Sequence, residues 1–324
     1  MYHEFYGLRE LPFELTPNTS YLFLTALQRE ALSTLQYGLS AAKPLTLLVG
    51  DAGTGKTTLI RAALESDRCR GVRCVYLNNP VLTTDDFVRT LAIRFELTSA
   101  AAQSKSVLLE ELEQQLRERR ARGQITALVV DEAQSLTSGL LEEVRLLANI
   151  ETEREKLLPL VLAGQPELAV KLEESGLRQL KQRVTLRCEL RPFDLADTAA
   201  YISSRITTAG GVPARLFTRD AVTLVHEYSN GIARTINVIC DNALVTGMAL
   251  GRQPADGRIV VEVCRDLALR KNATVPAAAS VPTGDTRPVS GATPTSAGKP
   301  PKRRDLRSWW RRNPYSTQIR VITE

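Results

Sequence analysis

Short apolar runs alternate with longer segments of helical periodicity in the first two thirds of the chain. The runs are almost continuously apolar, which is typical of strands that helices cover on both faces. This pattern predicts an α/β fold with a doubly wound parallel sheet. The five predicted strands are LTLLV at 45–49, RCVYL at 73–77, ITALVV at 125–130, LPLVLA at 158–163 and VTLRCEL at 184–190.

After Arg191-Pro192 the strand signal ends, and apolar residues recur every three or four positions. The first such segment follows Asp194, a candidate helix cap, and ends at Gly210-Gly211; two more follow around residues 217–228 and 236–247. These segments predict a small all-α lid domain. The predicted organisation is a helical and loop segment over 1–40 that contributes to the candidate functional site described below, an α/β core over 41–191 and the lid over 192–271.

The C-terminal part of the chain has a different composition. Residues 272–298 are rich in Pro, Ala, Ser, Thr and Gly, which predicts a disordered linker. Residues 299–324 form a basic tail that holds both tryptophans, Trp309 and Trp310. Residues 271–324 carry 10 basic and 3 acidic side chains, so the net charge of +6 comes from this end, while residues 1–270 have 32 basic and 33 acidic side chains. An anionic membrane surface, an acidic protein and DNA all remain open as partners of the tail.

Composition and the absence of certain patterns narrow the class of protein. The five cysteines are odd in number and form no C-x-x-C pair, which indicates reduced, buried thiols. The two histidines, His3 and His226, lie far apart in the sequence, which argues against a zinc site. Because no apolar run approaches the roughly 18 residues of a membrane span and the N-terminus lacks a signal-peptide pattern, we expect a cytoplasmic protein that could bind peripherally to the inner membrane.

A glycine-rich sequence between the first predicted strand and the next helix fits the pattern G-x-x-x-x-G-K-[ST]. Glycines allow the backbone N–H groups to curl around a phosphate, and the following helix N-terminus adds positive potential. We expect Lys56 to reach the β- and γ-phosphates of ATP and the Thr57 hydroxyl to bind Mg²⁺. The candidate nucleotide-binding residues are Gly50, Asp51, Ala52, Gly53, Thr54, Gly55, Lys56, Thr57 and Thr58.

Two carboxylates, Asp131 and Glu132, directly follow the third predicted strand, ITALVV. They fall at the carboxyl edge of the predicted sheet, where doubly wound folds bind ligands. We expect Asp131 to hold Mg²⁺ through water and Glu132 to orient and deprotonate the attacking water. An acidic pair after a strand is also a common helix cap, but the upstream phosphate loop favours the catalytic interpretation.

Three further residues are candidates for contact with the γ-phosphate. Gln165 follows the fourth predicted strand and would lie near that phosphate if this strand runs between the first and third; otherwise it is a turn residue before Pro166. Arg183 precedes the last predicted strand, and Arg234 begins a lid helix. A guanidinium group matches phosphate oxygens and keeps its charge, although either arginine could instead be solvated or paired with a carboxylate.

Taken together, these motifs resemble the AAA+ ATPases of the general secretion pathway protein A or ExeA type, whose relatives include MshM and the exosortase-system ATPases. The resemblance covers about residues 2 to 268 and includes the opening FYGLRELPFELTPNTSYLFLT. Gln28 and Asn18-Thr19 depart from the family's usual residues there, which we expect to alter the adenine pocket. The internal motifs are GDAGTGKTT, LVVDEAQSL, LVLAGQPEL, LRQLKQRV and NGIARTIN.

The resemblance implies roles for individual residues. Lys56 and Thr57 match Walker A, Asp131 and Glu132 match Walker B, Gln165 falls at the sensor-1 position, and Arg234 matches the sensor-2 arginine of the lid. Arg183, with Arg178 as the weaker alternative, matches the arginine finger that reaches into a neighbouring subunit.

The expected function is that of a Mg-ATP-dependent ATPase in a ring or filament, which serves a secretion system, a type IV-like pilus or a polysaccharide exporter. The alternative is a DNA-associated AAA+ ATPase similar to transposition regulators. The basic tail favours this alternative, and the neutral body argues against it.

Overall fold

The computed structural model describes residues 1–16, 18–78 and 83–271, all of which belong to one compact unit. The predictions for the linker at 272–298 and for the tail at 299–324, with Trp309 and Trp310, lie outside the described residues.

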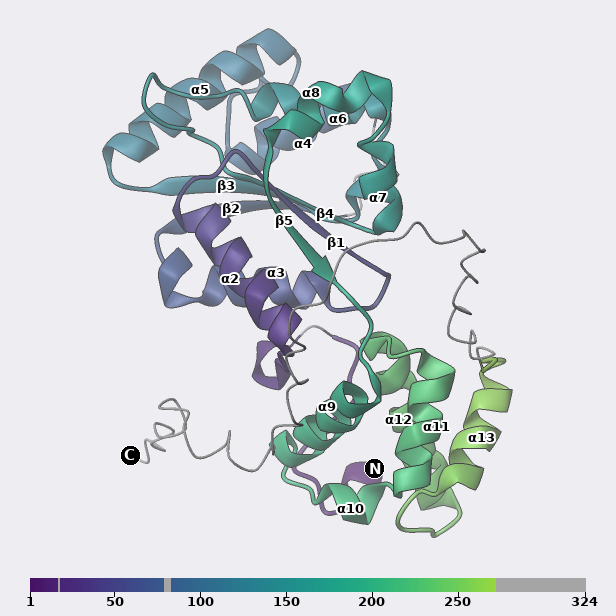
Figure 1. The fold of residues 1–324 in the computed structure, drawn as a ribbon. Helices are drawn as coiled ribbons and strands as arrows, with labels where there is room; N and C mark the ends of the chain where they lie inside the picture. Colours follow the sequence, from purple (N-terminus) through teal and green to yellow (C-terminus); the bar gives the residue numbers. More distant parts are fainter. Residues whose placement is uncertain (17, 79–82, 272–324) are drawn as a thin grey trace, which may run out of the picture. The chain divides into compact units, whose positions relative to one another are not determined.

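A parallel sheet of five strands forms the centre of the α/β part, as the apolar runs predict (Figure 1). The strand order is β2-β3-β4-β1-β5, so β4 lies between β1 and β3. The fourth strand begins two residues later than predicted, after Pro159, whose ring nitrogen has no N–H to give to a ladder. The strands are β1 (Leu45–Gly50), β2 (Val72–Leu77), β3 (Ile125–Val130), β4 (Leu160–Gly164) and β5 (Val184–Leu190).

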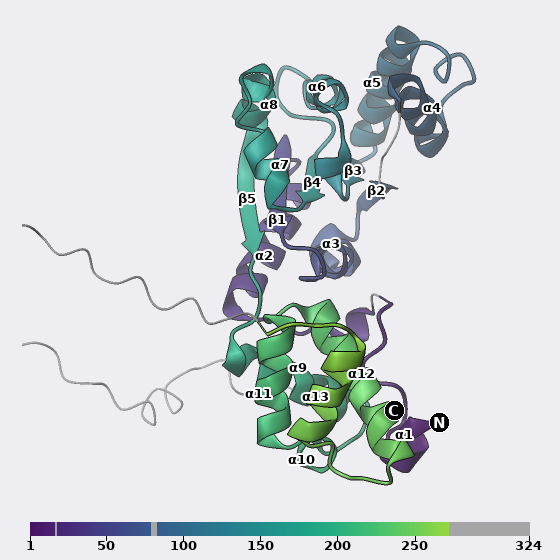
Figure 2. The same cartoon turned by 90° about the vertical axis from the view of Figure 1, so that its right-hand side faces the viewer.

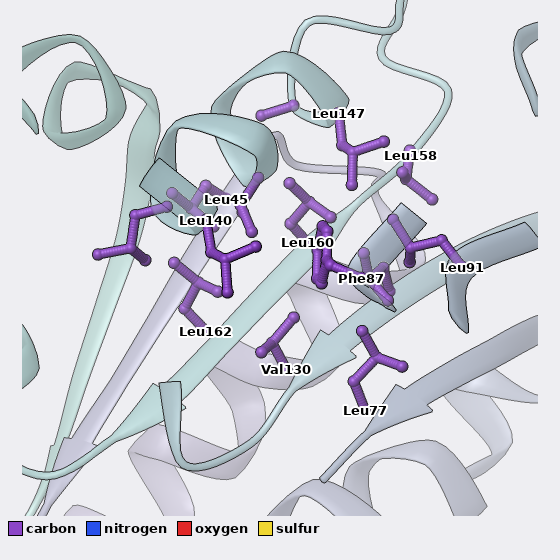
Figure 3. Close-up of a cluster of buried hydrophobic side chains, with 14 of the residues drawn as sticks. Leu45, Leu77, Phe87, Leu91, Val130, Leu140, Leu147, Leu158, Leu160 and Leu162 are labelled. Carbon is purple, nitrogen blue, oxygen red and sulfur yellow. The ribbon is translucent and has the colours of Figure 1, made fainter. Parts of the chain in front are cut away.

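Helices cover both faces of this sheet, which explains why the inner strands β1, β3 and β4 are almost entirely apolar and buried, whereas the edge strands β2 and β5 also carry exposed charged residues (Figure 1). Leu45 and Leu162 face a large apolar cluster that also holds Phe87 and Leu140 (Figure 3), whereas Leu48 faces a second cluster on the opposite side. The helices that contribute side chains to the first cluster are α4 (Thr84–Phe95), α5 (Lys105–Ala121), α6 (Ser138–Leu147), α7 (Pro166–Lys171) and α8 (Arg178–Arg183). Those that contribute to the second are α2 (Ala26–Ser40) and α3 (Lys56–Glu65).

A separate group of helices with its own apolar core follows β5 (Figure 2). Asp194 caps the first of them by accepting a hydrogen bond from the Asp197 N–H at 2.7 Å, as predicted. Thr218 caps another in the same way. The helices are α9 (Leu195–Thr208), α10 (Pro213–Leu216), α11 (Arg219–Ser229), α12 (Ala233–Ala249) and α13 (Gly257–Asp266), of which α10 and α13 were not anticipated from the sequence.

The N-terminal segment joins these two bodies. Helix α1 (Tyr2–Phe5) packs on α12, where the Tyr2 hydroxyl donates a hydrogen bond to Asp241 and the Tyr6 hydroxyl donates one to the Arg252 carbonyl at 3.3 Å. Phe13 is buried in the core of the lid helices, whereas Leu35 of α2 is buried against the sheet. The first 40 residues therefore contribute side chains to both cores.

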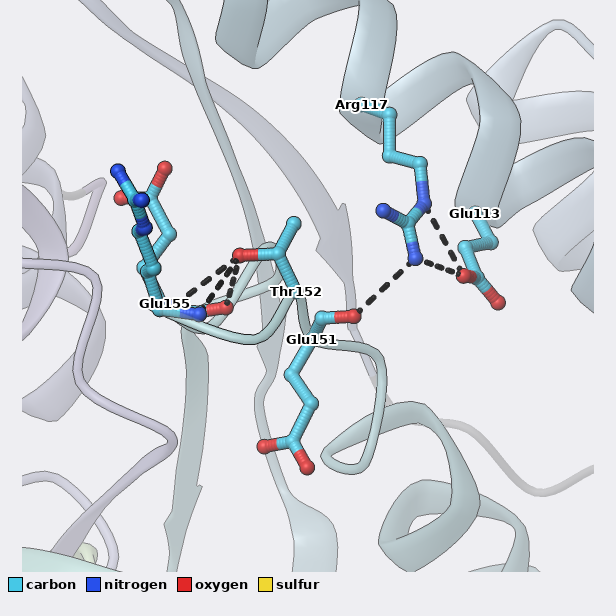
Figure 4. A network of polar contacts seen from close by, with 6 residues as sticks. Glu113, Arg117, Glu151, Thr152 and Glu155 are labelled. Carbon is cyan, nitrogen blue, oxygen red and sulfur yellow. Dashed lines mark hydrogen bonds and ion pairs between the residues drawn. The ribbon is translucent and has the colours of Figure 1, made fainter.

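Polar contacts anchor the loop between α6 and β4 (Figure 4). Arg117 of α5 donates to the carboxylate of Glu113 at 2.6 Å and to the carbonyl of Glu151 at 3.4 Å. Thr152 closes the loop by accepting from the Glu155 N–H at 3.1 Å. Among the described residues, no helix combines the length and the apolar character that crossing a bilayer requires.

Candidate functional site

The glycine-rich loop joins the carboxyl end of β1 to the N-terminus of α3, as the sequence pattern predicts. The Lys56 ammonium donates hydrogen bonds to the carbonyls of Gly50 at 2.8 Å and Asp51 at 3.1 Å. The side chain is 5% exposed, and this burial lowers its pKa, while the nearby carboxylates of Glu132 and Asp131 oppose the shift. A buried cation beside helix N–H groups is suited to binding phosphate oxygens.

Asp131 lies directly beside Thr57, although 74 residues separate them in the sequence. The Thr57 hydroxyl and the Tyr76 hydroxyl both donate to Oδ2 of Asp131, at 2.7 and 2.6 Å, and the Glu132 N–H donates to Oδ1 at 2.9 Å. This places a hydroxyl oxygen next to a buried carboxylate, the oxygen ligands that Mg²⁺ prefers alongside phosphate and water. The residues present therefore fit a magnesium ion, with Thr57 and Asp131 as the groups that would hold it.

Two amide side chains contact the carboxylate of Glu132. Gln134 donates from Nε2 to Oε2 of Glu132 at 2.6 Å, and Gln165 donates to the same oxygen at 3.4 Å. The proximity of Gln165 follows from the sheet order, because β4 lies between β1 and β3. The structure thus meets the condition on which the prediction for Gln165 depended, and the side chain joins the site through Glu132.

A cavity of about 440 Å³ opens beside these groups. It has the size of a small-molecule site and mixes polar and aromatic side chains. Gly50, the last residue of β1, and the next two residues, Asp51 and Ala52, precede the loop residues that line the cavity and are not among its lining residues. The predicted site residues that do line it are Gly53, Thr54, Gly55, Lys56, Thr57, Thr58, Glu132 and Arg234.

The lid reaches the phosphate loop at the start of α12. The Arg234 N–H donates to the Gly53 carbonyl at 3.1 Å. Gly53 has a φ of +81°, and a Cβ atom there would lie 2.8 Å from the Arg234 Cβ, so both conformation and space require glycine. Arg234 therefore lies at the cavity of its own chain, and its contact with the γ-phosphate stays a prediction.

An aromatic group that the sequence analysis missed lines the cavity next to the lid. Phe23, Phe193 and Tyr201 pack together with ring centroids 5.2 to 5.8 Å apart. The Tyr201 hydroxyl accepts from buried Arg205 at 2.8 Å and donates to Asn237 at 2.9 Å. These residues come from separate segments, so no local pattern marks them as a group.

Gln28 and Asn18, where the sequence departs from the resembled family, also line the cavity. The Gln28 side chain caps α2 by accepting from the Thr25 N–H at 3.0 Å. Tyr76 lies near the carboxyl end of the edge strand β2, and this position was the signal that could have revealed its contact with Asp131.

Arg183 and Arg178 are not among the residues that line the cavity of their own chain. Arg183 ends α8 directly before β5, at the amino end of the parallel strands, whereas the phosphate loop follows their carboxyl end. It lies near Glu151, whose pKa is lowered mainly by Lys156 and to a smaller extent by Arg183. Within one chain, the structure therefore does not bring Arg183 to the nucleotide site.

Comparison with known proteins supports the fold and the relationship that the sequence motifs indicate. Residues 40–172 match the sequence model of a family described as an AAA domain. The chain is 41% identical over 251 residues to general secretion pathway protein A of Aeromonas hydrophila, a match that covers 78% of this chain. The chain spans 46% of the length of that relative.

Solved structures with the same fold include the Cdc6p protein of Pyrobaculum aerophilum and the ORC2 protein of Aeropyrum pernix. The match to Cdc6p has a TM-score of 0.60 at 17% identity and covers 79% of this chain and 70% of the Cdc6p chain. The match to ORC2 has a TM-score of 0.59 at 14% identity and covers 78% of this chain and 72% of the ORC2 chain. At these identities the likeness concerns the fold. The phosphate loop, the parallel sheet and the matched sequences show that the chain has the AAA P-loop NTPase fold and is related to general secretion pathway protein A.

Proposed function

We propose that the protein is a Mg-ATP-dependent ATPase that hydrolyses ATP at subunit interfaces and thereby drives assembly of an envelope machine. The observation that carries the proposal is that Lys56, Thr57 and Glu132 line one cavity, with Asp131 hydrogen-bonded to Thr57 beside it. Phosphoryl transfer requires a cation for the transferring phosphate, ligands for Mg²⁺ and a carboxylate for the attacking water. All three lie at the carboxyl end of β1 and β3.

In the proposed reaction, ATP and water give ADP and phosphate. A water oxygen forms a bond to the γ-phosphorus while the bond to the β-phosphate oxygen breaks, and Glu132 accepts the proton that water loses. Lys56 and Arg234 stabilise the negative charge that spreads over the transferring group. Bound Mg²⁺ would neutralise further charge on the β- and γ-phosphates.

The position of Arg183 supports hydrolysis between subunits. Strand β5 has seven residues, so Arg183 lies about 20 Å from the carboxyl edge at which the phosphate loop begins. An arginine side chain cannot span that distance. If Arg183 contacts the γ-phosphate, that nucleotide belongs to a neighbouring subunit, which is what a ring or filament would provide.

The proposed cellular role rests on the relationship to general secretion pathway protein A. The name of that relative refers to a secretion pathway, so the machine we propose is a secretion system, a type IV-like pilus or a polysaccharide exporter. Components of that machine are the proposed partners, and the proposed location is the cytoplasm or the cytoplasmic surface of the inner membrane.

Replacement of Lys56 by alanine tests the nucleotide site. We expect Lys56→Ala to weaken Mg-ATP binding by about 10- to 100-fold, because a buried charge-assisted hydrogen bond to phosphate is lost. Isothermal titration calorimetry measures the affinity. Lys181→Ala, which removes an exposed lysine paired with Glu173, is the control and should bind like the wild type. Unchanged affinity of Lys56→Ala would contradict the assignment.

A further inference from the structure

Gln134 makes two hydrogen bonds that connect two parts of the site. Its Nε2 donates to Oε2 of Glu132 at 2.6 Å, and its Oε1 accepts from the backbone N–H of Gln165 at 3.0 Å. One amide thus bridges the turn after β3 and the turn after β4. No role of its own was predicted for Gln134 from the sequence.

The surroundings of Gln134 are shaped around this bridge. A Cβ atom on Gly164, the last residue of β4, would lie 2.9 Å from Oε1 of Gln134, so a side chain at this position would force the amide to move. On the other side, Ser135 fixes the same turn by donating from its backbone N–H and its hydroxyl to the Glu132 carbonyl, at 3.0 and 2.8 Å. The amide is therefore held in place between two fixed backbone segments.

The hydrogen bond that Nε2 of Gln134 donates also makes the two carboxylate oxygens of Glu132 different from each other. Both Gln134 and Gln165 donate to Oε2, and within residues 1–16, 18–78 and 83–271 no hydrogen bond reaches Oε1. A carboxylate oxygen that already accepts two hydrogen bonds is a poorer proton acceptor than its partner. Oε1 is thus the oxygen available for a proton from water.

We propose that Gln134 is a positioning residue that holds Glu132 and Gln165 together so that Oε1 of Glu132 faces the attacking water. This inference rests on the proposed ATPase function. Gln134 acts through Glu132 and Gln165, and we do not place it in contact with the substrate. Its loss should affect turnover far more than nucleotide binding.

The variant Gln134→Glu tests this inference because it keeps the size and the acceptor for the Gln165 N–H. While ionised, the new carboxylate cannot donate to Glu132 and adds a second negative charge beside it. We expect kcat at pH 7.5 to fall by about 10- to 100-fold, with a change of less than about threefold in KM for ATP. We also expect the acidic limb of the kcat–pH profile to move up by about one unit, because a neighbouring carboxylate makes the pair retain a proton to higher pH.

Gln114→Glu is the matched control. Gln114 makes the same kind of bond, from its amide to the carboxylate of Glu118 at 3.1 Å, but on the exposed surface of α5. This variant should retain the kcat, the KM and the pH profile of the wild type. Thermal unfolding of both variants shows whether either has lost stability.

Two results would overturn the role of Gln134. The first is a wild-type kcat together with an unmoved acidic limb of the kcat–pH profile in Gln134→Glu. The second is a lower kcat together with lower stability while the acidic limb of the profile stays in place, because a purely structural role would produce that result. A wild-type chain that binds ATP without hydrolysing it would overturn the proposed function itself, and this inference with it.

A double-mutant cycle provides a second, independent measurement. If Gln134 and Gln165 act together on one oxygen of Glu132, the loss of kcat in Gln134→Ala combined with Gln165→Ala should be smaller than the product of the two single losses. Multiplicative losses would show that the two amides act separately, and the proposed bridge would then be wrong.

Discussion

Glu132 adopts a left-handed backbone conformation, with a φ of +54° and a ψ of +36°. For a residue other than glycine this conformation costs roughly 1–2 kcal/mol, so the surroundings must stabilise it. The Asp131 carboxylate accepts from the Glu132 N–H, and Ser135 donates to the Glu132 carbonyl. Because these bonds hold the backbone on both sides, the direction of the Glu132 side chain is set by the turn as well as by its own contacts.

Replacement of Glu132 by glutamine separates binding from hydrolysis. We expect Glu132→Gln to bind Mg-ATP with an affinity close to that of the wild type and to release phosphate about 10²- to 10⁴-fold more slowly, because the amide cannot accept the proton from water. Calorimetry and a phosphate-release assay measure the two quantities. Glu110→Gln, at an exposed position on α5, is the control. Phosphate release at the wild-type rate would rule out Glu132 as the base.

At the residue scale, the sequence predicted those parts of the site that lie in short motifs. Lys56 and Thr57 come from one such motif and Asp131 and Glu132 from another, and the structure brings the two together. Tyr76 and the aromatic group around Tyr201 were missed. Their proximity to the site depends on strand order and on how the lid packs, and neither leaves a mark within a single stretch of sequence.

At the scale of elements, the sequence predicted those helices that have both an N-terminal capping residue and apolar residues at helical spacing. Asp194 opens α9 as expected, and Thr218 opens α11 with the same kind of cap. Helix α13 carries the same signals, a cap at Asp256 followed by buried Ile259 and Val263, and could have been recognised. Helix α1, with four residues, is stabilised through tertiary packing on α12, which local sequence does not encode.

Replacement of Gly231 by alanine tests how much the close contact between Gly231 and Phe193 stabilises the connection between the sheet and the lid helices. Its φ is +72°, and a Cβ atom there would lie 2.0 Å from the Phe193 carbonyl oxygen. Its own carbonyl accepts from the Phe193 N–H at 2.9 Å. We expect Gly231→Ala to lower the free energy of unfolding by about 2 kcal/mol or more, because the backbone must shift and this bond must weaken. Urea unfolding followed by far-UV circular dichroism measures it.

The control for Gly231 is an exposed glycine with open space around it. A Cβ atom on Gly71 would meet no other atom within 4 Å, so Gly71→Ala should change the free energy of unfolding by less than about 0.5 kcal/mol. Equal stability of the two variants would show that the close approach of Gly231 to Phe193 is not required.

At the scale of the whole molecule, the sequence predicted the fold class but not how its parts are joined. The parallel sheet and the helical lid follow from a change of apolar period after residue 191. That the first residues of the chain complete the core of the last helices does not follow from any local pattern, because Tyr2 and Asp241 are 239 positions apart. Such pairings arise only from the folded arrangement.

A mixing experiment tests whether Arg183 acts across subunits. Arg183→Ala and Glu132→Gln should each reduce ATP hydrolysis, whereas a mixture of the two should recover part of the activity, since some interfaces would combine an intact Glu132 with an intact Arg183. Arg122→Ala, which removes the exposed arginine directly after α5, is the control. Activity of the mixture equal to the mean of the separate variants would show that Arg183 does not complete a neighbour's site.

The contact between Gly53 and Arg234 has a mechanical consequence. Helix α12 begins at this contact and has 17 residues, which makes it about 25 Å long. With its first turn fixed to the phosphate loop, a rotation of roughly 10° about that point would displace its far end by about 4 Å. Tyr2 and Tyr6 bind Asp241 and the Arg252 carbonyl, farther along α12 and just beyond its end. The helix would thus rotate about its N-terminal end at the phosphate loop, and the first residues of the chain would move with its C-terminal end.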